Sequence, residues 1–262
     1  MLETFTPTGK LKHFVKCYII VDCDETIVNS MLPGTSLTLG FRYKGTTKYL
    51  TDRENTLPFA VVAGLRKSIQ LMKDDTNTGN LLVIFNTEGA AAFFKEQIHE
   101  MFGEVLSLNE FSNFKELNAL EDRLCEAKSS EQRIQIIESF LLTKLYDYKQ
   151  DPLIANAVEV IKTHNGLLKI KDLAARHFLS LDAFEKRFRR AVGASPKQFS
   201  YIVRMNSIIG SLNKRSITET VFEAGYYDQA HFTKDFKLFT GQTPTVTLRS
   251  TTSCVAIIQR YD

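Results

Sequence analysis

The stretch Asp228-Gln-Ala-His-Phe-Thr-Lys-Asp-Phe-Lys-Leu-Phe-Thr-Gly-Gln-Thr-Pro244 has a second copy 48 residues earlier, Ser180-Leu-Asp-Ala-Phe-Glu-Lys-Arg-Phe-Arg-Arg-Ala-Val-Gly-Ala-Ser-Pro196. The paired residues are Ser180 with Asp228, Phe184 with Phe232, Lys186 with Lys234, Phe188 with Phe236, Arg189 with Lys237, Gly193 with Gly241, Ser195 with Thr243, and Pro196 with Pro244. A capping residue, phenylalanines four positions apart and a closing glycine predict the same capped helix in each copy.

A shorter helical pattern precedes each copy. Residues 170–177 and 217–224 match with an offset of 47, so the second copy has one more residue in the turn before its capping residue. A short helix, a tight turn and a capped second helix form the helix-turn-helix pattern. A longer helix beginning at Ser195-Pro196 and running to about residue 212 joins the two units. Another helix, over 154–161, precedes them and stops at Asn165-Gly166.

The faces that the phenylalanines leave exposed carry hydrogen-bonding groups and cations. An α-helix fits the major groove of DNA, where its exposed side chains meet base edges. The alternative is two amphipathic helices with ordinary solvated faces. Two copies with matched caps, glycines and prolines favour DNA recognition over that alternative.

The arrangement resembles the C-terminal DNA-binding domain of the AraC/XylS family of bacterial transcription regulators, over about residues 153–249. The second unit carries the more specific match: Gly225-Tyr226-x-Asp228-Gln229-Ala230-His231-Phe232-x-Lys234-x-Phe236-Lys237-x-Phe239-x-Gly241-x-Thr243-Pro244. The first unit matches at Leu173-Ala174, Leu179-Ser180, Phe184, Phe188, Gly193, Ser195-Pro196 and Phe199. The chain departs from the family pattern at Thr220-Val221, at Tyr226 and after Pro244.

The resemblance implies that two units read successive major-groove segments on one face of double-stranded DNA. The positions it implies for base reading are Asp182, Glu185, Lys186, Gln229, Ala230, Thr233 and Lys234. The expected phosphate contacts are Arg189, Arg190, Lys197, Lys237 and Thr243. Gln229 suits adenine and Lys234 suits guanine. Asp182 also suits the positive end of its helix, which is an alternative role for it.

Charge divides the chain in two. Residues 1–150 carry 17 Lys and Arg against 20 Asp and Glu, whereas residues 151–262 carry 16 against 10. A basic C-terminal half is typical of a polyanion partner. The predicted domains are a β-rich sensor or dimerisation domain over 1–150, the DNA-binding domain over 151–250, and a tail over 251–262. The polar stretch Tyr148–Pro152 is the expected linker.

The N-terminal half predicts strands followed by helices. Strand patterns cover Phe14–Val21, Leu37–Tyr43 and Leu81–Phe85, with turn signals between them. Helical spacing follows at 93–102, 112–127 and 131–147. The fold class is therefore α+β: a small β-barrel-like domain with flanking helices, then an all-α domain. Residues 10–110 are also similar to the barrel-like N-terminal domain of some of these regulators, through Leu32-Pro-Gly34 and Phe93-Phe94.

Two questions about the N-terminal half stay open at this point. An interior lined by aromatic and aliphatic residues would hold a small apolar effector or be a filled core, and a filled core is favoured. The helices over 112–127 and 131–147 would form a homodimer interface or pack on the barrel. Asp22-Cys-Asp-Glu25 is acidic but follows a strand, so a solvated turn is favoured over a metal site. No cofactor and no catalytic residue is predicted.

Composition narrows the setting of the protein. Four scattered cysteines predict free thiols in a cytoplasmic protein. No apolar run reaches the length of a membrane helix, and no signal peptide is visible. RNA polymerase, an effector and a second copy of the chain stay open as partners besides DNA.

Two other functions compete with a transcription regulator. A DNA-repair methyltransferase with the same DNA-binding module would need a cysteine in a Pro-Cys-His-Arg setting, and none of the four cysteines has those neighbours. A ligand-independent interaction protein would have a degenerate second unit. The intact Lys234, Lys237 and Thr243-Pro244 argue against it.

Overall fold

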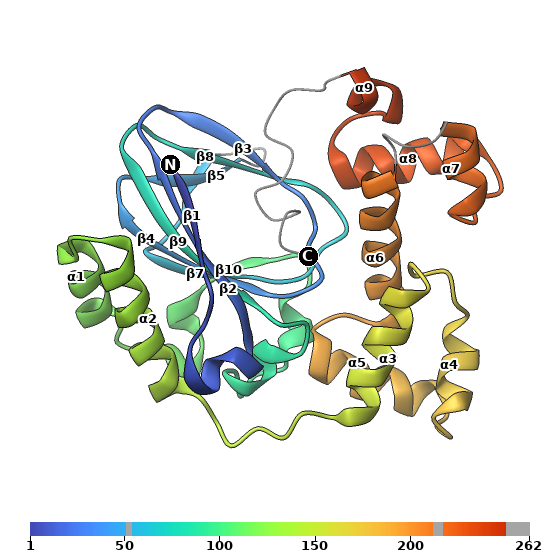
Figure 1. Ribbon diagram of the computed structural model, residues 1–262, viewed down its shortest axis with the longest axis horizontal. Helices are drawn as coiled ribbons and strands as arrows, with labels where there is room; N and C mark the ends of the chain where they lie inside the picture. Colours follow the sequence, from blue (N-terminus) through green and yellow to red (C-terminus); the bar gives the residue numbers. More distant parts are fainter. Residues whose placement is uncertain (51–53, 212–216, 250–262) are drawn as a thin grey trace.

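The computed structural model describes residues 1–50, 54–211 and 217–249. A β-rich N-terminal part is followed by a helical C-terminal part (Figure 1). The predicted α+β class, with two helix-turn-helix units joined by a long helix, is confirmed. The predicted tail over 251–262 lies outside the described residues, as does a fourth cysteine, Cys254.

Over the described residues, the strands pair antiparallel in two sheets. The larger sheet has the order β1-β2-β9-β4-β7-β10 and the smaller has the order β3-β8-β5-β6. The strands are β1 (Leu2–Phe5), β2 (Val15–Cys23), β3 (Ile27–Met31), β4 (Thr38–Lys44), β5 (Thr47–Leu50), β6 (Glu54–Thr56), β7 (Ala60–Ala63), β8 (Gln70–Asp74), β9 (Thr78–Phe85) and β10 (Val105–Ser107). β2, β4 and β9 confirm the three predicted strand patterns.

The larger sheet has two different faces because side chains alternate along a strand. On β4, Leu39 and Phe41 are fully buried on the face that packs against the helices of the main core. Gly40 and Arg42 point to the other face, toward the smaller sheet. A separate small cluster of Cys17, Ile19, Val21 and Ile84 lies outside that main core. Val21 of this cluster also lines the space between the two sheets.

Helices close the N-terminal part, with one correction to the prediction. α1 (Asn118–Glu126) falls within its predicted range, and α2 (Ser130–Lys144) begins one residue before its predicted range. α1 packs against α2 and against β4 of the larger sheet. The helix predicted over 93–102 is wrong, since this stretch holds only the 3₁₀ turn η3 (Ile98–Met101) after η2 (Gly89–Ala92). Phe93 packs against Phe14 and Phe85. The apolar spacing there reflects burial against several partners instead of one helical face.

Further short turns complete this region: η1 (Gly9–His13), η4 (Leu108–Glu110) and η5 (Ser112–Phe114). The helix predicted over 112–127 starts later than expected, at Asn118. Glu116 has φ +65°, a left-handed conformation that a right-handed helix cannot contain. The apolar residues Leu120 and Leu124 nevertheless face the core, as their spacing predicted.

The C-terminal helices agree closely with the predicted pattern. They are α3 (Pro152–Thr163), α4 (Ile170–Arg176), α5 (Leu181–Val192), α6 (Pro196–Ser211), α7 (Ile217–Glu223), α8 (Gln229–Thr240) and α9 (Pro244–Arg249). α4 and α5 form the first unit, and α7 and α8 form the second. α6 packs against both units. The Phe199 ring lies 5.6 Å from that of Phe188, and the Tyr201 ring lies 6.0 Å from that of Phe239.

Candidate nucleic-acid interface

The second helix of the first unit, α5, is fixed at both ends by its own sequence. The Ser180 hydroxyl accepts a hydrogen bond from the Ala183 amide (3.2 Å), which satisfies a free N–H of the first turn. Gly193 ends the helix with φ +82°, a conformation that glycine adopts at little cost. Phe184 and Phe188 are fully buried. Their burial fixes which side of α5 faces outward.

The second helix of the second unit, α8, repeats this construction. The Asp228 carboxylate accepts from the His231 amide at 2.7 Å. Gly241 ends the helix with φ +79°. Phe232 and Phe236 are fully buried, as the repeat predicts.

The turns differ by one residue, as the two offsets predicted. The left-handed positions are Phe178 (φ +56°) and Gly225 (φ +71°), 47 residues apart, whereas the capping residues are 48 apart. The extra residue therefore lies between the left-handed position and the cap. In the second unit Tyr226 fills this turn, with its hydroxyl donating to Asp235 Oδ2 at 2.9 Å.

The predicted base-reading residues of α5 lie on its outer side. Asp182 and Lys186 are exposed. Glu185 is half-buried and lies 3.7 Å from Arg189, one turn along the helix. Arg189 and Arg190, predicted to contact phosphate, are exposed in the last turn. Asp182 lies in the first turn, where a carboxylate is favoured by the helix dipole.

The predicted residues of α8 are also on its outer side. Gln229, Ala230 and Lys234 are exposed. Thr233 is half-buried, and its hydroxyl donates to the Gln229 carbonyl at 2.8 Å, so only its methyl group and hydroxyl lone pairs stay free for a base. Lys237 is exposed in the last turn.

The two remaining predicted phosphate contacts lie at helix starts. Lys197 is exposed in the first turn of α6, and Thr243 is half-buried immediately before α9. Ser195 and Gln198 close the start of α6 reciprocally. The Gln198 side chain accepts from the Ser195 amide at 2.8 Å, while the Ser195 hydroxyl accepts from the Gln198 amide at 3.2 Å.

The site residues thus form two sets, one on α5 and one on α8. The two helices lie near opposite ends of α6 (Figure 1). A bipartite surface of this kind can address two separate segments of one ligand.

The surroundings of α5 were not predicted. Asp182, Glu185, Lys186, Arg189 and Arg190 line a cleft of about 850 Å³. Its other walls are Ala91 and residues 94–99 of the N-terminal domain, and residues 146–148, which follow α2. The outer side of α5 therefore faces the N-terminal domain across this cleft.

Several contacts hold the two domains together. Lys162 on α3 donates to the Thr87 hydroxyl (3.0 Å), and Asn206 on α6 donates to the Pro33 carbonyl (3.2 Å). The Ile69 amide donates to the Leu238 carbonyl of α8 (3.3 Å). These contacts join residues far apart in sequence, and no local pattern signals them.

Arg187 and Glu88, close to the connection between the two domains, have roles that the sequence did not reveal. Arg187 forms a bidentate pair with Asp151, with both N···O distances 2.9 Å, and so ties α5 to the linker. Burial raises the pKa of the Glu88 carboxyl to about 7, and the nearby Asp151 and Glu159 carboxylates act in the same direction. The Asp151-Pro152 pair was visible as a linker signal, but its partner 36 residues away was not.

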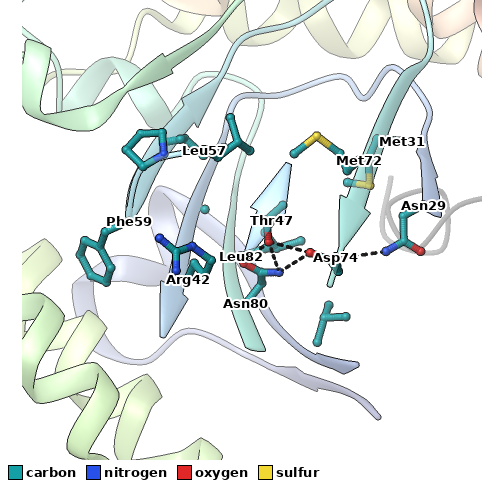
Figure 2. A pocket seen from close by; sticks show the side chains of 14 residues that line it. Asn29, Met31, Arg42, Thr47, Leu57, Phe59, Met72, Asp74, Asn80 and Leu82 are labelled. Atoms are coloured by element: carbon teal, nitrogen blue, oxygen red, sulfur yellow. Dashed lines mark hydrogen bonds between the residues drawn. The ribbon is translucent and has the colours of Figure 1, made fainter. Parts of the chain in front are cut away.

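The N-terminal domain contains a cavity of about 80 Å³ between its two sheets. Figure 2 shows its lining, which is largely apolar apart from Arg42 and a polar cluster around Asp74. The sequence favoured a filled core, whereas the structure has this small cavity between the two sheets. Among the described residues no cluster of His, Cys, Asp or Glu has the form of a metal site, and no helix is long and apolar enough to cross a membrane.

Two family models match this chain, one in each part. Residues 173–250 match the family model of a helix-turn-helix domain, and residues 3–107 match a domain of unknown function, DUF6597. The search of curated proteins found no match.

Solved structures with a similar fold include ToxT from Vibrio cholerae, at 11% identity with a TM-score of 0.47, over 96% of this chain and 99% of that one. The unsaturated fatty acid bound form of ToxT aligns at 13% identity and a TM-score of 0.46, over 91% and 96%. The C-terminal domain of AraT from Geobacillus stearothermophilus aligns at 20% and 0.37, over 42% and 93%. Since these TM-scores are below 0.5, the proposals that follow depend on the residues of this chain.

Proposed function

Because the chain belongs to the AraC/XylS family of DNA-binding transcription regulators, we propose that α5 and α8 read two successive major-groove segments of its DNA target. The observation that carries this proposal is the matched capping of α5 and α8, which leaves the predicted polar residues of both helices outward. The two outer faces differ in sequence, so the target should be asymmetric. Arg189, Arg190, Lys197 and Lys237 supply the charged phosphate contacts.

The first test is DNA affinity as a function of salt concentration. With these four cations on phosphates, the logarithm of the association constant should fall with the logarithm of salt concentration with a slope of about −3.6. Target sequences would be obtained by selection from genomic DNA fragments with the purified protein. Binding that does not depend on salt or on sequence would contradict the proposal.

A matched pair of variants tests whether both units read bases. Lys234→Ala and Lys186→Ala remove equivalent lysines from α8 and α5. Each should weaken binding by about 1–3 kcal/mol and relax base preference at one position, and the two positions should lie in different halves of the target. If only Lys234→Ala changes base preference, a bipartite reader is the wrong description.

We further propose that DNA binding requires α5 to move away from the N-terminal domain. A major groove about 12 Å wide must enclose a reading helix on both sides, and residues 94–99 occupy one of those sides. In the arrangement described here, with α5 facing residues 94–99 (the closed arrangement), some polar atoms beside the cleft have no hydrogen-bond partner within the described part of the chain. Glu96, His99 and Tyr146 line the cleft, and one polar atom of each (Glu96 Oε2, His99 Nδ1 and the Tyr146 hydroxyl) is buried without a hydrogen-bond partner among the described residues. Unpaired buried polar atoms disfavour the closed arrangement.

Hydrogen exchange tests this movement. Saturating target DNA should slow amide exchange in α5 and α8 but speed it in residues 94–101, which lose the contact with α5. Slower exchange in both walls of the cleft would show that DNA is bound with the domains still closed. In this proposal the N-terminal domain controls access to DNA, with an effector, RNA polymerase or a second copy of the chain as the controlling partner.

A further inference from the structure

Each of the two helices proposed to read DNA has one polar side chain that ties it to another part of the protein. These side chains are Arg187 on α5 and Asp235 on α8. They are 48 residues apart, so they occupy the same position of the sequence repeat. Each directly follows a lysine proposed to read bases, Lys186 or Lys234. Their charges are opposite, so the same position must serve the two helices through different partners.

On α8, the Asp235 carboxylate is held by the turn of its own unit. The Tyr226 hydroxyl donates to Asp235 Oδ2 at 2.9 Å. Tyr226 is buried, and this burial raises the pKa of its hydroxyl far above the usual range. The hydroxyl therefore keeps its proton and remains a donor. The exposed His231 ring lies 3.7 Å from the same carboxylate oxygen.

The helix α6 contributes to the same contact. The Arg204 guanidinium lies 4.6 Å from the centre of the Tyr226 ring, and its Nη2 is 3.4 Å from the hydroxyl. The Tyr201 hydroxyl, also on α6, donates to the Asp235 backbone carbonyl at 3.3 Å. α8 is therefore tied to the helix that joins the two units.

The first unit cannot use this contact, because its turn is one residue shorter and has no tyrosine. Phe178, the left-handed residue of that turn, is almost fully exposed. Arg187 instead pairs with Asp151, its Nε and Nη2 each 2.9 Å from one carboxylate oxygen. Asp151 also accepts from the Leu153 amide at 3.1 Å and so caps α3. α5 is therefore tied to the start of α3.

The Arg187–Asp151 and Asp235–Tyr226 contacts, the anchors of α5 and α8, restrict rotation of each helix about its own axis. Burial of phenylalanines is favourable but has little directionality, whereas hydrogen bonds have narrow ranges of distance and angle. A side-chain end lies about 6 Å from the axis of its helix, so a rotation of about 20° moves it by about 2 Å. A displacement of that size breaks a hydrogen bond to a base edge.

We propose that Arg187 and Asp235 are positioning residues that set the rotation of α5 and α8 in the DNA grooves, α5 through Asp151 and α8 through Tyr226. This inference rests on the proposed function, because base preference is its readout. Neither residue has to contact DNA itself. The two anchors should act independently, since their partners lie in different elements.

The test compares two variants that each weaken one anchor and leave the reading side chains in place. Tyr226→Phe removes the hydroxyl that donates to Asp235. Asp151→Asn removes the charge that pairs with Arg187, while asparagine can still cap α3. For each protein, the Kd is measured for the selected DNA target and for targets with one base substituted in either half. The lysine variants described above show which half each helix reads.

The expected result is a loss of discrimination between bases that is confined to one half. Tyr226→Phe should reduce the ratio of the substituted-target Kd to the selected-target Kd about five-fold or more in the α8 half, and should leave the α5 half within about two-fold of the wild type. Asp151→Asn should do the reverse. A loss of stability alone would lower the affinity for every sequence and leave this ratio unchanged.

Two results would contradict the inference. An unchanged ratio in one variant would overturn the anchor of that helix. Equal losses in both halves would overturn the inference as a whole, because they would show that each contact supports the entire domain.

Variants of Asp235 guard against a folding defect in Tyr226→Phe. Asp235→Asn keeps an oxygen that can accept from the Tyr226 hydroxyl and should retain the α8-half preference, whereas Asp235→Ala should lose it. The double variant Tyr226→Phe, Asp235→Ala should lose no more than either single variant, because both changes remove the same hydrogen bond. Additive losses would overturn the α8 anchor. Chemical denaturation checks that each protein keeps a cooperative transition.

Failure of the proposed function would look different from failure of this inference. A wild-type protein without base preference in either half would refute the two-part reading of DNA, and the positioning roles with it. A wild-type protein with preference in both halves supports that function, and the variants then decide the positioning roles alone.

Discussion

The two helix-turn-helix units have the same caps and the same buried phenylalanines, yet their reading helices have different neighbours. The outer residues of α5 line a cleft whose far wall belongs to the N-terminal domain. α8 contacts that domain near its own C-terminal end, where the Leu238 carbonyl accepts from the Ile69 amide. Duplication of a sequence therefore preserved the internal construction of a unit but not its surroundings. If both helices read DNA as proposed, the outer face of α5 has to leave this cleft first, since residues 94–99 lie opposite it.

The largest effect should come from truncating the matched phenylalanines. Phe188→Ala and Phe236→Ala each remove a fully buried ring and should cost about 3–5 kcal/mol of unfolding free energy, measured by chemical denaturation. The effects of the two variants should extend over different parts of the protein, because α5 packs on η2 and η3 of the N-terminal domain. Phe188→Ala should speed hydrogen exchange in residues 94–101, and Phe236→Ala should not. Equal effects there would remove the distinction between the units.

The next largest effect is the pH dependence of stability that the Glu88 carboxyl causes. Burial raises the folded-state pKa of Glu88 to about 7 from its ordinary value of 4.5. Below about pH 4.5 the carboxyl is protonated in both states, so it adds no penalty. As pH rises toward 7, only the unfolded state releases the proton, so stability falls, by on the order of 3 kcal/mol, and then levels off above pH 7.

Glu88→Gln should remove this loss. The variant should be more stable than the wild type at pH 8 and nearly equal to it at pH 4.5, as measured by denaturant unfolding at both values. Glu110→Gln is the control, because it alters an exposed carboxylate that is not among the groups shifting the Glu88 pKa. A wild-type stability that is flat between pH 4.5 and 7 would contradict the role of Glu88.

A smaller difference separates the two closing glycines. Both have left-handed φ values, so alanine should cost about 1 kcal/mol at either position. A Cβ at Gly193 would also lie 3.1 Å from Leu37 Cδ1 and 3.3 Å from the Ile98 carbonyl, whereas one at Gly241 would lie 3.4 Å from Ile69. Gly193→Ala should therefore cost about 2 kcal/mol in total, roughly twice the cost of Gly241→Ala. The unfolding free energies of the two variants decide this.

The smallest expected effect lies in the turn of the first unit. Phe178 is 97% exposed and left-handed, at the position that glycine occupies in the second unit. Phe178→Gly should relieve backbone strain and raise stability by about 1 kcal/mol, seen as a higher Tm. Phe222→Gly is the control, since Phe222 is also exposed but lies within a helix, where glycine destabilises. A lower Tm for Phe178→Gly would show that its ring makes a stabilising contact.

Sequence patterns were informative where structure is local. The caps at Ser180 and Asp228, the closing glycines and the buried phenylalanines all follow from interactions within a few residues. The same is true of the strand alternation in β4 and β9. The extra residue in the second turn was also visible, because two offsets of the repeat could be compared directly.

Long-range packing was not visible in the sequence. Phe93 and its neighbours have helical spacing, but they pack against β-strands and other aromatic rings as short 3₁₀ turns. The cleft beside α5 arises from residues 94–99, which precede Asp182 by more than 80 positions. The cavity at Arg42 depends on how two sheets face each other. Such features arise from tertiary contacts, for which the periodicity of a single segment contains no signal.

The helix α6 also determines how the two units are rotated relative to each other about its axis. Phe199 packs on the first unit, and Tyr201 packs on the second only two residues later. Each residue of an α-helix turns the chain by about 100° and advances it by about 1.5 Å. One inserted residue between these contacts would turn one reading helix away from the side of the duplex that the other faces. Four inserted residues would nearly restore the direction while separating the two contacts by about 6 Å. If both units read one duplex as proposed, insertions of about one helical turn should therefore be tolerated better than single insertions.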